Sequence, residues 1–332
     1  MSIDIKTMSV EPKRQTFAHV ARRLGGDAPA SRYEEGVYDL QATAHFHYRP
    51  IWGPEHWHFD EGRTAIKMQD WYLFKDPRQF YYGTYTVTRA NMHQTTDRNF
   101  AFEEKRNMLA NVDPAWREML VKYLIPLRHY EWGANMNACS ISDAGYGTAI
   151  TSAMIFTAGD RLGIAQILSR IGMLLSGGDG EMLDAAKAEW MQADAWQGVR
   201  KAIEDSLVLK DWFETLVAQF LVMDGLVYPL VYEHFDQEGQ KHGAAAVTML
   251  CEFMSDWNTE HNRWVDAVVK VAAAESDENR ALMSGWYTQW RDVFSDALQP
   301  LATTVLGDGA QAAINDVRDQ LDARAAKLGL NI

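Results

Sequence analysis

One motif in the sequence has the residue types and spacing of a metal-binding pair. Four-helix bundles bind two metal ions with a Glu on each of two helices and a Glu-x-x-His pair on each of the other two. Residues i and i+3 share one face of a helix, so both side chains of such a pair reach the same site. The only Glu-x-x-His in the chain, Glu55 to His58, follows Pro54 in a proline-rich stretch. The long helical segments contain none, so the sequence does not supply a site of this kind.

Four of the ten histidines gather in that same stretch: His45, His47, His56 and His58. An H-x-H pair in extended chain points both rings to one face, which would allow a metal clip. Aromatic side chains outnumber these ligands, so we favour interface contacts or local hydrogen bonds. Other signatures of catalysis are missing from the sequence. There is no G-x-S-x-G, and the SGGDG of residues 176–180 lacks the Gly-Lys-Ser/Thr that completes a phosphate-binding loop.

The composition bounds the class of protein. With 332 residues and 47% hydrophobic content, including 12 Trp, 13 Tyr and 13 Phe, the chain can bury a large core. A net charge of -13 argues against a nucleic-acid or anionic-membrane partner. The two cysteines, Cys139 and Cys251, are typical of a reducing cytoplasm, and the polar N-terminus has no apolar signal segment. We expect an acidic cytoplasmic protein with no nucleic-acid and no membrane partner.

The elements that would position these residues divide into two parts. Residues 1–76 hold four of the nine prolines and no long apolar repeat, yet they are rich in Tyr, Trp, Phe and His, unlike a disordered tail. We predict an extended arm that docks on a partner subunit, because aromatic side chains supply contact area. The alternative is an irregular cap packed on the chain's own bundle. Deleting residues 1–62 should weaken assembly and leave the bundle helical.

Residues 77–332 are predicted to form a helical domain around the stretch from Glu131 to Leu175. Within it, the run between Asp143 and Asp160 has no charge, and this uncharged run is too short to span a bilayer. A helix without a polar face is normally buried on all sides, so we predict one central helix that is buried all round. The only segment that resembles a strand, Thr84 to Thr88, is predicted to be helical. Helices are predicted to begin at Asp76-Pro77 and at Asp113-Pro114, with a break at Pro126, and the central helix is predicted to end at SGGDG. Three further helices are predicted over Glu181–Gln197, Asp211–Phe235 (with a kink at Pro229) and His242–Ala274. Two more are predicted in Asp277–Gly329, separated near Gln299-Pro300 and Leu306–Gly309.

Three segments carry a resemblance to a known family. They are HYRPIWGPEHWHFD (47–60), DWYLFKDPRQFYYGTYTVTRANMHQTTDRNF (70–100) and the GDRLGIAQ of the central stretch. The chain resembles the beta, or small oxygenase, subunit of bacterial multicomponent monooxygenases, the soluble di-iron family, and within it the phenol hydroxylase branch. The resemblance covers essentially the whole chain. It implies an all-α, ferritin-like helical bundle with extra C-terminal helices and an extended N-terminal arm.

The resemblance also implies a function and partners. The family's oxygenase is a heterohexamer of two alpha, two beta and two gamma chains, and it hydroxylates phenol and related aromatics with O2. A regulatory protein and an NADH-dependent reductase with FAD and a 2Fe-2S cluster serve it. The di-iron centre lies in the alpha subunit, so the resemblance implies that this chain is a structural subunit of an enzyme, with no catalytic, cofactor or metal residue of its own.

The residues at the family's metal-binding positions support that reading. Where the catalytic paralogue has Glu-x-x-His, this chain has Asp160-Arg161-Leu162-Gly163, and glycine cannot bind a metal. On the later helix neither Asp256 to Thr259 nor Glu260 to Arg263 completes the pair. The residues proposed to contact a partner subunit are Tyr48, Arg49, Pro50, Trp52, Trp57, Trp71, Phe80, Tyr81 and Tyr82.

Two alternatives to a scaffolding subunit remain open from the sequence. One is a self-sufficient helical metalloprotein with atypical carboxylate ligands, drawn from Glu103, Glu104, Asp160, Asp224 and Glu260. Missing Glu-x-x-His pairs count against it. The other is an unrelated helical protein that binds an apolar ligand between its helices. The aromatic arm, which has no evident use in a free monomer, counts against this one.

Overall fold

The computed structural model describes residues 16–26, 28–44, 47, 49–51 and 53–332, and within these ranges it contains helices and no strand. The prediction of an all-α protein is confirmed. The α-helices are α1 (Ala18–Leu24), α2 (Arg32–Val37), α3 (Tyr82–Arg106), α4 (Pro114–Tyr123), α5 (Leu127–Ala144), α6 (Thr148–Leu175), α7 (Glu181–Gln192), α8 (Asp194–Ser206), α9 (Trp212–Leu216), α10 (Asp224–Pro229), α11 (Asp236–Gln240), α12 (Ala245–Leu250), α13 (Glu252–Glu275), α14 (Asp277–Leu306) and α15 (Ala310–Lys327). The 3-10 turns are η1 (Glu61–Arg63), η2 (Trp71–Leu73), η3 (Met108–Asn111) and η6 (Gly307–Gly309), and the wider π-helical segments are η4 (Val217–Met223) and η5 (Leu230–Phe235).

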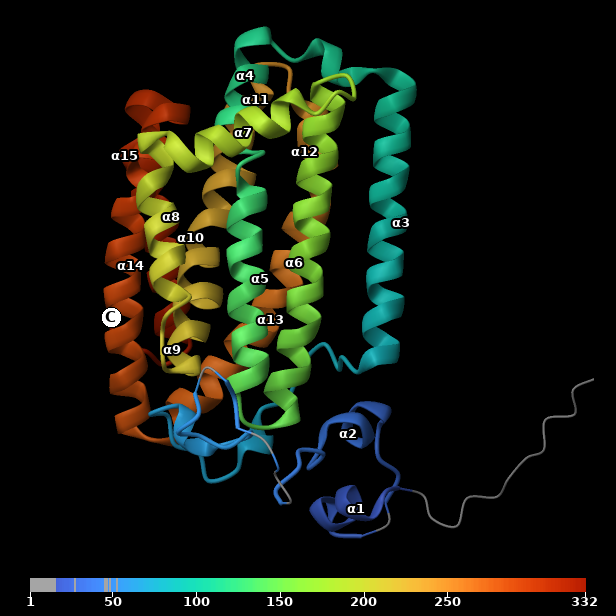
Figure 1. Cartoon of the computed structure of the whole chain (residues 1–332), viewed down its shortest axis with the longest axis vertical. Helices are drawn as coiled ribbons and strands as arrows, with labels where there is room; N and C mark the ends of the chain where they lie inside the picture. The colour runs from blue at the N-terminus through green and yellow to red at the C-terminus, as the bar shows by residue number, and fades with distance from the viewer. Residues whose placement is uncertain (1–15, 27, 45–46, 48, 52) are drawn as a thin grey trace, which may run out of the picture.

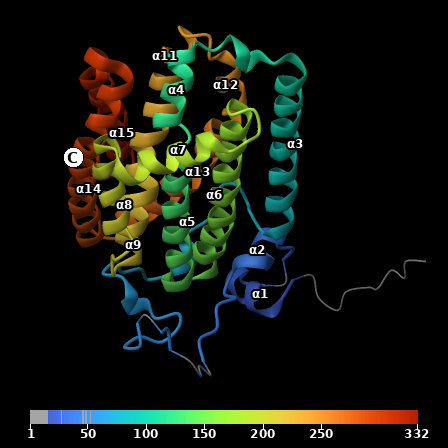
Figure 2. The same ribbon diagram turned by 45° about the horizontal axis from the view of Figure 1, so that its top comes forward.

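The long helices stand side by side in one bundle. Figure 1 shows α5 and α6 next to each other at the front, between α8 on one side and α3 on the other. Helix α14 packs against α8, η4 and α15, while α13 lies behind α6 (Figure 1). Figure 2 shows the small helices α1 and α2 below the bundle, close to the lower ends of α3 and α6. The bundle's interior is therefore enclosed by helices from all parts of the domain.

The central stretch is two antiparallel helices, so the prediction of one central helix is wrong. The chain reverses between α5 and α6 at residues 145–147. Gly147 has a φ of +87°, which favours glycine, and a Cβ on Gly145 would lie 2.6 Å from the carbonyl oxygen of Ile141. The expectation of burial on all sides is also wrong, because Trp132 on α5 is 55% exposed and Ile155 on α6 is 52% exposed.

Other helix boundaries confirm some predictions and correct others. Thr84 to Thr88 is helical, α4 begins at Pro114, and the chain breaks at Pro126 before α5. Helix α3 begins at Tyr82 rather than at Asp76-Pro77, because Gln79 adopts a positive φ of 56°.

Two segments that were predicted as single helices are broken. Residues 181–197 divide into α7 and α8 at the extended Ala193, and this bend brings the rings of Trp190 and Trp196 within 5.3 Å of each other. Residues 242–274 divide into α12 and α13 at Cys251. Conversely, α14 continues through Pro300, so the predicted division there is wrong. Buried contacts of Leu298 and Leu301 hold the helix to the core on both sides of the proline. The division near Leu306–Gly309 is confirmed.

The segment from α9 to α11 is one continuous helix that runs from Trp212 to Gln240 through both π-helical segments, and Pro229 lies inside it, directly before η5. In the described part of the chain it is the one helix long and apolar enough to cross a membrane. However, 83% of its most apolar window is buried inside the bundle, as expected of a core helix.

Part of the predicted arm packs on the chain's own bundle. The side chain of Asn279, at the start of α14, bonds both the backbone N–H and the carbonyl of Lys67 (3.0 and 2.7 Å). Asp211 accepts from the N–H of Ala65 at 2.6 Å. The rings of Trp71 and Trp212 lie 5.7 Å apart in the core. The cap alternative therefore holds for this part, and the division of the chain at residue 76 stays a prediction.

Candidate functional site

The interior of the bundle holds an arginine where three helices meet. Arg161 on α6 is fully buried. Its Nη1 donates to Glu131 on α5 at 2.8 Å and to the Tyr228 hydroxyl on α10 at 3.0 Å, and its Nη2 is paired with Asp224 on α10. Tyr228 in turn donates to the second oxygen of Glu131 at 3.0 Å. We call Arg161, Glu131, Asp224 and Tyr228 the Arg161 cluster.

A second ring of polar side chains completes the hydrogen bonds of Asp224. The hydroxyl of Tyr130 donates to Oδ1 of Asp224 at 2.6 Å, and the amide of Gln219 donates to the same atom at 3.1 Å. Asn137 donates to Gln219 at 2.9 Å. Gln219 lies in the π-helical segment η4, whose wider turn precedes Asp224 on the same helix. Such π-helical turns are rare and occur frequently at functional sites.

The charges of the Arg161 cluster depend on one another. Burial alone would lower the pKa of Arg161, but the carboxylates of Asp224 and Glu131 raise it well above its usual value. Burial raises the pKa of Glu131, and Arg161 opposes that shift. The guanidinium also lies 4.4 Å from the ring centre of Trp257, which adds a cation–π contact. Removing Arg161 would leave both carboxylates buried without a counter-charge.

A second ion cluster lies on the other side of α6. Asp160, adjacent to Arg161, accepts two hydrogen bonds of 2.8 Å from Arg89 on α3. Arg89 also pairs with Glu260 on α13, at 2.7 and 2.9 Å. The indole N–H of Trp257 donates to Asp160 at 2.8 Å, and the guanidinium of Arg161 lies over the face of the same ring. The two clusters thus join α3, α13, α6, α5 and α10 into one polar network through the bundle.

His261, the histidine nearest to a Glu-x-x-His position, lies in an aromatic cage. It stacks on Trp257 and Trp264, with ring centres 4.7 and 5.8 Å apart, and it meets Phe220 edge-on. Neither ring nitrogen has a hydrogen-bond partner in the part of the chain that the structure describes. Burial, with Arg78, Arg161 and Arg89 nearby, lowers the pKa of His261 well below its usual value, so the ring is neutral.

The residues of the bundle do not fit a di-iron site. Every carboxylate that the sequence offered as an atypical ligand already has another partner. Asp160 and Glu260 bind Arg89, and Asp224 binds Arg161. Glu103 accepts the N–H groups that follow α3, and Glu104 pairs with Arg170 at the surface. The described residues contain no group of three or more metal-ligating side chains.

The fit also fails at the position of the family's histidine. A Cβ on Gly163 would point to the ring of His93 on α3, at 3.6 Å from its Cε1. Two positions before Gly163, at a position that the motif leaves variable, stands Arg161, whose positive charge lies between the carboxylates of Glu131 and Asp224. A cation held by the chain itself replaces the charge that a metal would bring.

The structure separates the residues proposed to contact a partner. Tyr48 and Trp52, and with them His45 of the histidine group, lie outside the described residues. Pro50, Trp71 and Phe80 are buried in the chain itself and leave little surface for a partner. Trp57 and Tyr82 are exposed, Tyr81 is partly buried, and Arg49 lies over the ring of Trp57 at 4.3 Å. Of the remaining histidines, His56 binds Asp60 at 2.8 Å.

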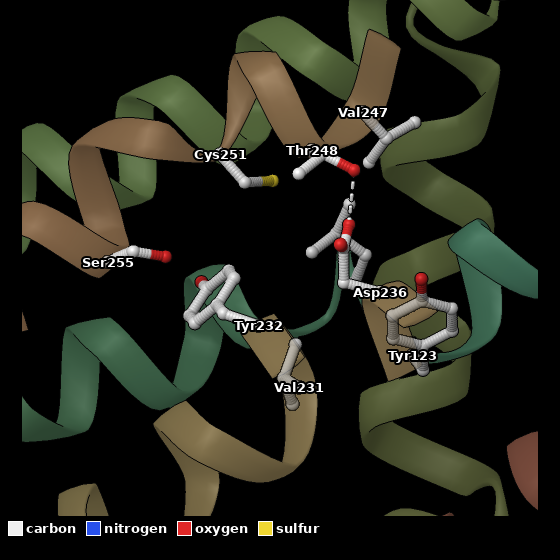
Figure 3. A pocket seen from close by; sticks show the side chains of 9 residues that line it. Tyr123, Val231, Tyr232, Asp236, Val247, Thr248, Cys251 and Ser255 are labelled. Carbon is white, nitrogen blue, oxygen red and sulfur yellow. Dashed lines mark hydrogen bonds between the residues drawn. The ribbon is translucent and has the colours of Figure 1, made fainter. Parts of the chain in front are cut away.

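A small cavity lies between η5, α12 and the start of α13. Figure 3 shows Tyr232, Cys251, Ser255 and the Asp236–Thr248 pair around it. Its volume of about 30 Å³ accommodates one or two water molecules and is too small for an aromatic ring. The Tyr232 hydroxyl is buried here and has no protein partner among the described residues.

The Arg161 cluster was missed from sequence alone. Arg161 was noted only as part of a failed motif, and Glu131 and Tyr228 were not singled out. A signal was present, because the only two charges between Asp143 and Arg170, Asp160 and Arg161, lie within an otherwise apolar helix. Charges in such a setting are paired when buried.

Comparisons with known proteins agree with this architecture. Residues 52–276 match the Methane/Phenol/Alkene Hydroxylase family. The chain is 48% identical over 330 residues to the phenol 2-monooxygenase oxygenase component DmpL of Pseudomonas sp. (strain CF600), covering 99% of this chain and 98% of that one. It is 23% identical over 247 residues to the beta subunit of the toluene-4-monooxygenase hydroxylase of Ectopseudomonas mendocina, covering 74% and 75%. The solved phenol hydroxylase of Pseudomonas sp. OX1 superposes with a TM-score of 0.93 at 46% identity, covering 99% of both chains.

Proposed function

The chain belongs to the methane/phenol/alkene hydroxylase family, in its phenol hydroxylase branch, and we propose that it is the non-catalytic beta subunit of a phenol 2-monooxygenase oxygenase component. It has the ferritin-like bundle of that family. The proposed complex hydroxylates phenol and related aromatics with O2 and with electrons from NADH. The chain is then part of an enzyme without an active site of its own.

The observation that carries this proposal is the position of Arg161. The carboxylates that face one another inside the bundle, Glu131 and Asp224, bind its guanidinium. A ferritin-like site needs these oxygens free and needs histidines beside them. In the described part of this chain the carboxylates of the bundle interior are held in ion pairs and hydrogen bonds, which makes the interior rigid and leaves those oxygens unavailable to a metal pair.

Rigidity is also what the chain would contribute to catalysis. A catalytic site has to be held in a productive geometry by the groups that surround it, and a partner bundle can supply part of that support. We propose that the di-iron centre lies in the alpha subunit and that the complex contains two each of alpha, beta and gamma chains. A regulatory protein and a reductase carrying FAD and a 2Fe-2S cluster would dock on this cytoplasmic complex. The name of a relative as a hydroxylase component subunit beta supports a role beside other subunits.

The exposed part of the N-terminal arm is proposed to contact a partner subunit, since Trp57 is 44% exposed. Tyr82, at the start of α3, is 74% exposed and is proposed to extend this contact. Deletion of residues 1–62 should lower co-purification with the large subunit. The deletion also removes Tyr33 and Val37, which are part of the chain's own core. Circular dichroism of the truncated chain must therefore show an intact bundle before a loss of assembly is attributed to the arm.

An omission experiment tests the proposed function. The large subunit, reductase and regulatory protein are assayed for phenol hydroxylation with and without this chain, and the chain is also assayed without the large subunit. We expect activity only when the chain and the large subunit are both present. Hydroxylation by the chain without the large subunit would favour the alternative, a self-sufficient metalloprotein. Full activity without the chain would remove it from the oxygenase.

A further inference from the structure

On the outward side of the α5–α6 pair, a stretch without charge lies between Asp143, exposed at the lower end of α5, and Arg170 near the upper end of α6. Its exposed positions are Trp132, Met136, Cys139 and Ser140 on α5 and Ile155, Gly159, Leu162 and Gln166 on α6. We call these eight residues the α5–α6 outer face. Their spacing of three, four and seven residues puts each set on one stripe of its helix. The large side chains are exposed to a substantial degree: 55% for Trp132, 52% for Ile155, 42% for Met136 and 39% for Leu162.

The surroundings of this face are charged. Helix α8, which packs beside α5, exposes Lys201 and Asp205. At the upper end of α6, Arg170 pairs with Asp97 and Glu104 of α3. At the lower end, Arg63 pairs with Asp143. An apolar patch with a polar rim marks an interaction site on a protein surface, and the core of a protein interface is depleted of charge in the same way.

The face is also held rigidly from behind. Glu131 precedes Trp132, and Arg161 precedes Leu162, so the Arg161 cluster fixes both helices directly beneath the outer face. Figure 1 shows the two helices running side by side along the front of the bundle. Ser140 has a short side chain, so the α5 stripe leaves room beside it for a partner helix to approach closely. A pre-organised surface loses little conformational entropy when it binds.

We propose that the α5–α6 outer face is the docking surface for the large subunit of the oxygenase, which covers it with uncharged helical surface of its own. This inference rests on the proposed function. The absence of charge on the face excludes a nucleic acid or an anionic lipid headgroup, which bind through basic side chains. Relatives are named as a subunit beta and as a small subunit, which implies a larger, non-identical subunit beside them, so we assign that subunit as the occupant, with an apolar surface of its own. The proposed complex also contains a second copy of this chain, which is the competing occupant in the test below.

Substitution of one exposed residue tests the assignment. Ile155→Glu places a charge on the face without touching the core, so the free chain should keep its helicity and thermal midpoint. In the co-expressed complex the charge would be buried without a partner, and we expect affinity for the large subunit to fall about 100-fold. Val293→Glu, on α14, is the matched control, because Val293 is 48% exposed. Its complex should bind as the unsubstituted chain does.

Cys139 supplies a second readout that needs no substitution. It is exposed on the outer face, whereas Cys251 is buried and burial raises its pKa, so that its thiol stays unreactive. A maleimide should modify Cys139 in the free chain and should react at least about tenfold more slowly in the complex, as for a thiol in a desolvated interface. Cys251 serves as the internal reference in both states.

The outcomes separate the two proposals. If the unsubstituted chain forms no complex with the large subunit, the proposed function itself fails. If the complex forms but Ile155→Glu binds as Val293→Glu does and Cys139 stays reactive, the function stands and the docking surface is wrong. If Cys139 becomes protected in the free chain as its concentration rises, a second copy occupies the face, and the proposed partner is wrong.

Discussion

The inward and outward sides of the α5–α6 pair reverse the usual distribution of charge. The inward side buries Glu131, Asp160 and Arg161, the most costly side chains to remove from water, whereas the outward side exposes Trp132 and Ile155. In an isolated protein this arrangement is unfavourable on both sides. It becomes reasonable when the inner charges replace a metal site and the outer surface belongs to a complex. Whether a side chain of a subunit is buried therefore has to be judged in the assembled complex and not in the single chain.

The largest effect on stability is expected from Arg161→Met, on the inward side. The substitution leaves Glu131 and Asp224 buried without their counter-charge, so we expect a loss of about 3–5 kcal/mol in the free energy of unfolding, measured in urea. Arg170→Met is the control, because Arg170 pairs with Asp97 and Glu104 at the surface and should cost less than about 1 kcal/mol. Equal losses for the two variants would mean that the buried Arg161 contributes no more to stability than a surface arginine does.

A smaller effect is expected from the hydroxyl groups of two tyrosines that lie four residues apart. Tyr228→Phe removes the donor to Glu131 and an acceptor of Arg161, and it should cost about 1.5–3 kcal/mol in unfolding free energy, because both partners are charged. Tyr232→Phe is the matched control. Its buried hydroxyl has no protein partner in the described structure, so the loss should be close to zero. A reversed order would contradict the assigned hydrogen bonds.

The neutral His261 predicts a pH effect. Its pKa in the folded protein is lowered by burial, so below the ordinary pKa of histidine the unfolded chain binds a proton that the folded chain does not. Stability should then fall as the pH drops below about 6.5, by at most about 1.4 kcal/mol per pH unit for this one group. His261→Phe keeps an aromatic ring in the cage and should flatten the slope. His129, whose pKa burial lowers to about 4, acts in the same direction and is present in both proteins. Parallel slopes would contradict a neutral His261.

The smallest expected change is that of Gly163→His, which restores the histidine of the family motif. A Cβ at this position makes an ordinary contact with His93, so the fold should tolerate it. We expect no gain in iron after anaerobic loading with Fe(II), because Arg89, on the side of α6 that Gly163 faces, still holds Asp160 and Glu260. Stoichiometric iron in this variant would show that a histidine, not the arginine, is what the bundle lacks.

The sequence predicted the helical class and several helix ends, because proline and glycine mark them locally. Pro114 begins α4, and Gly307 to Gly309 separate α14 from α15. It did not predict the reversal at Gly147, since an uncharged run reads the same in one helix or two. Nor did it predict that Arg161 meets Asp224, which lies 63 positions away, because such pairings depend on how helices pack. The absence of charge on the central stretch predicted burial on all sides, which holds only for its inward side in this chain; burial of the outward side is proposed to come from another chain.

The iron content of the full-length chain tests the central claim most directly. The chain is purified alone, loaded anaerobically with Fe(II), freed of unbound metal and compared with the co-expressed complex treated in the same way. We predict that the lone chain retains no more iron than a control protein and that the complex retains iron in the large subunit. Stoichiometric iron in the lone chain would contradict the account, because the carboxylates assigned to Arg161 and Arg89 would then be metal ligands.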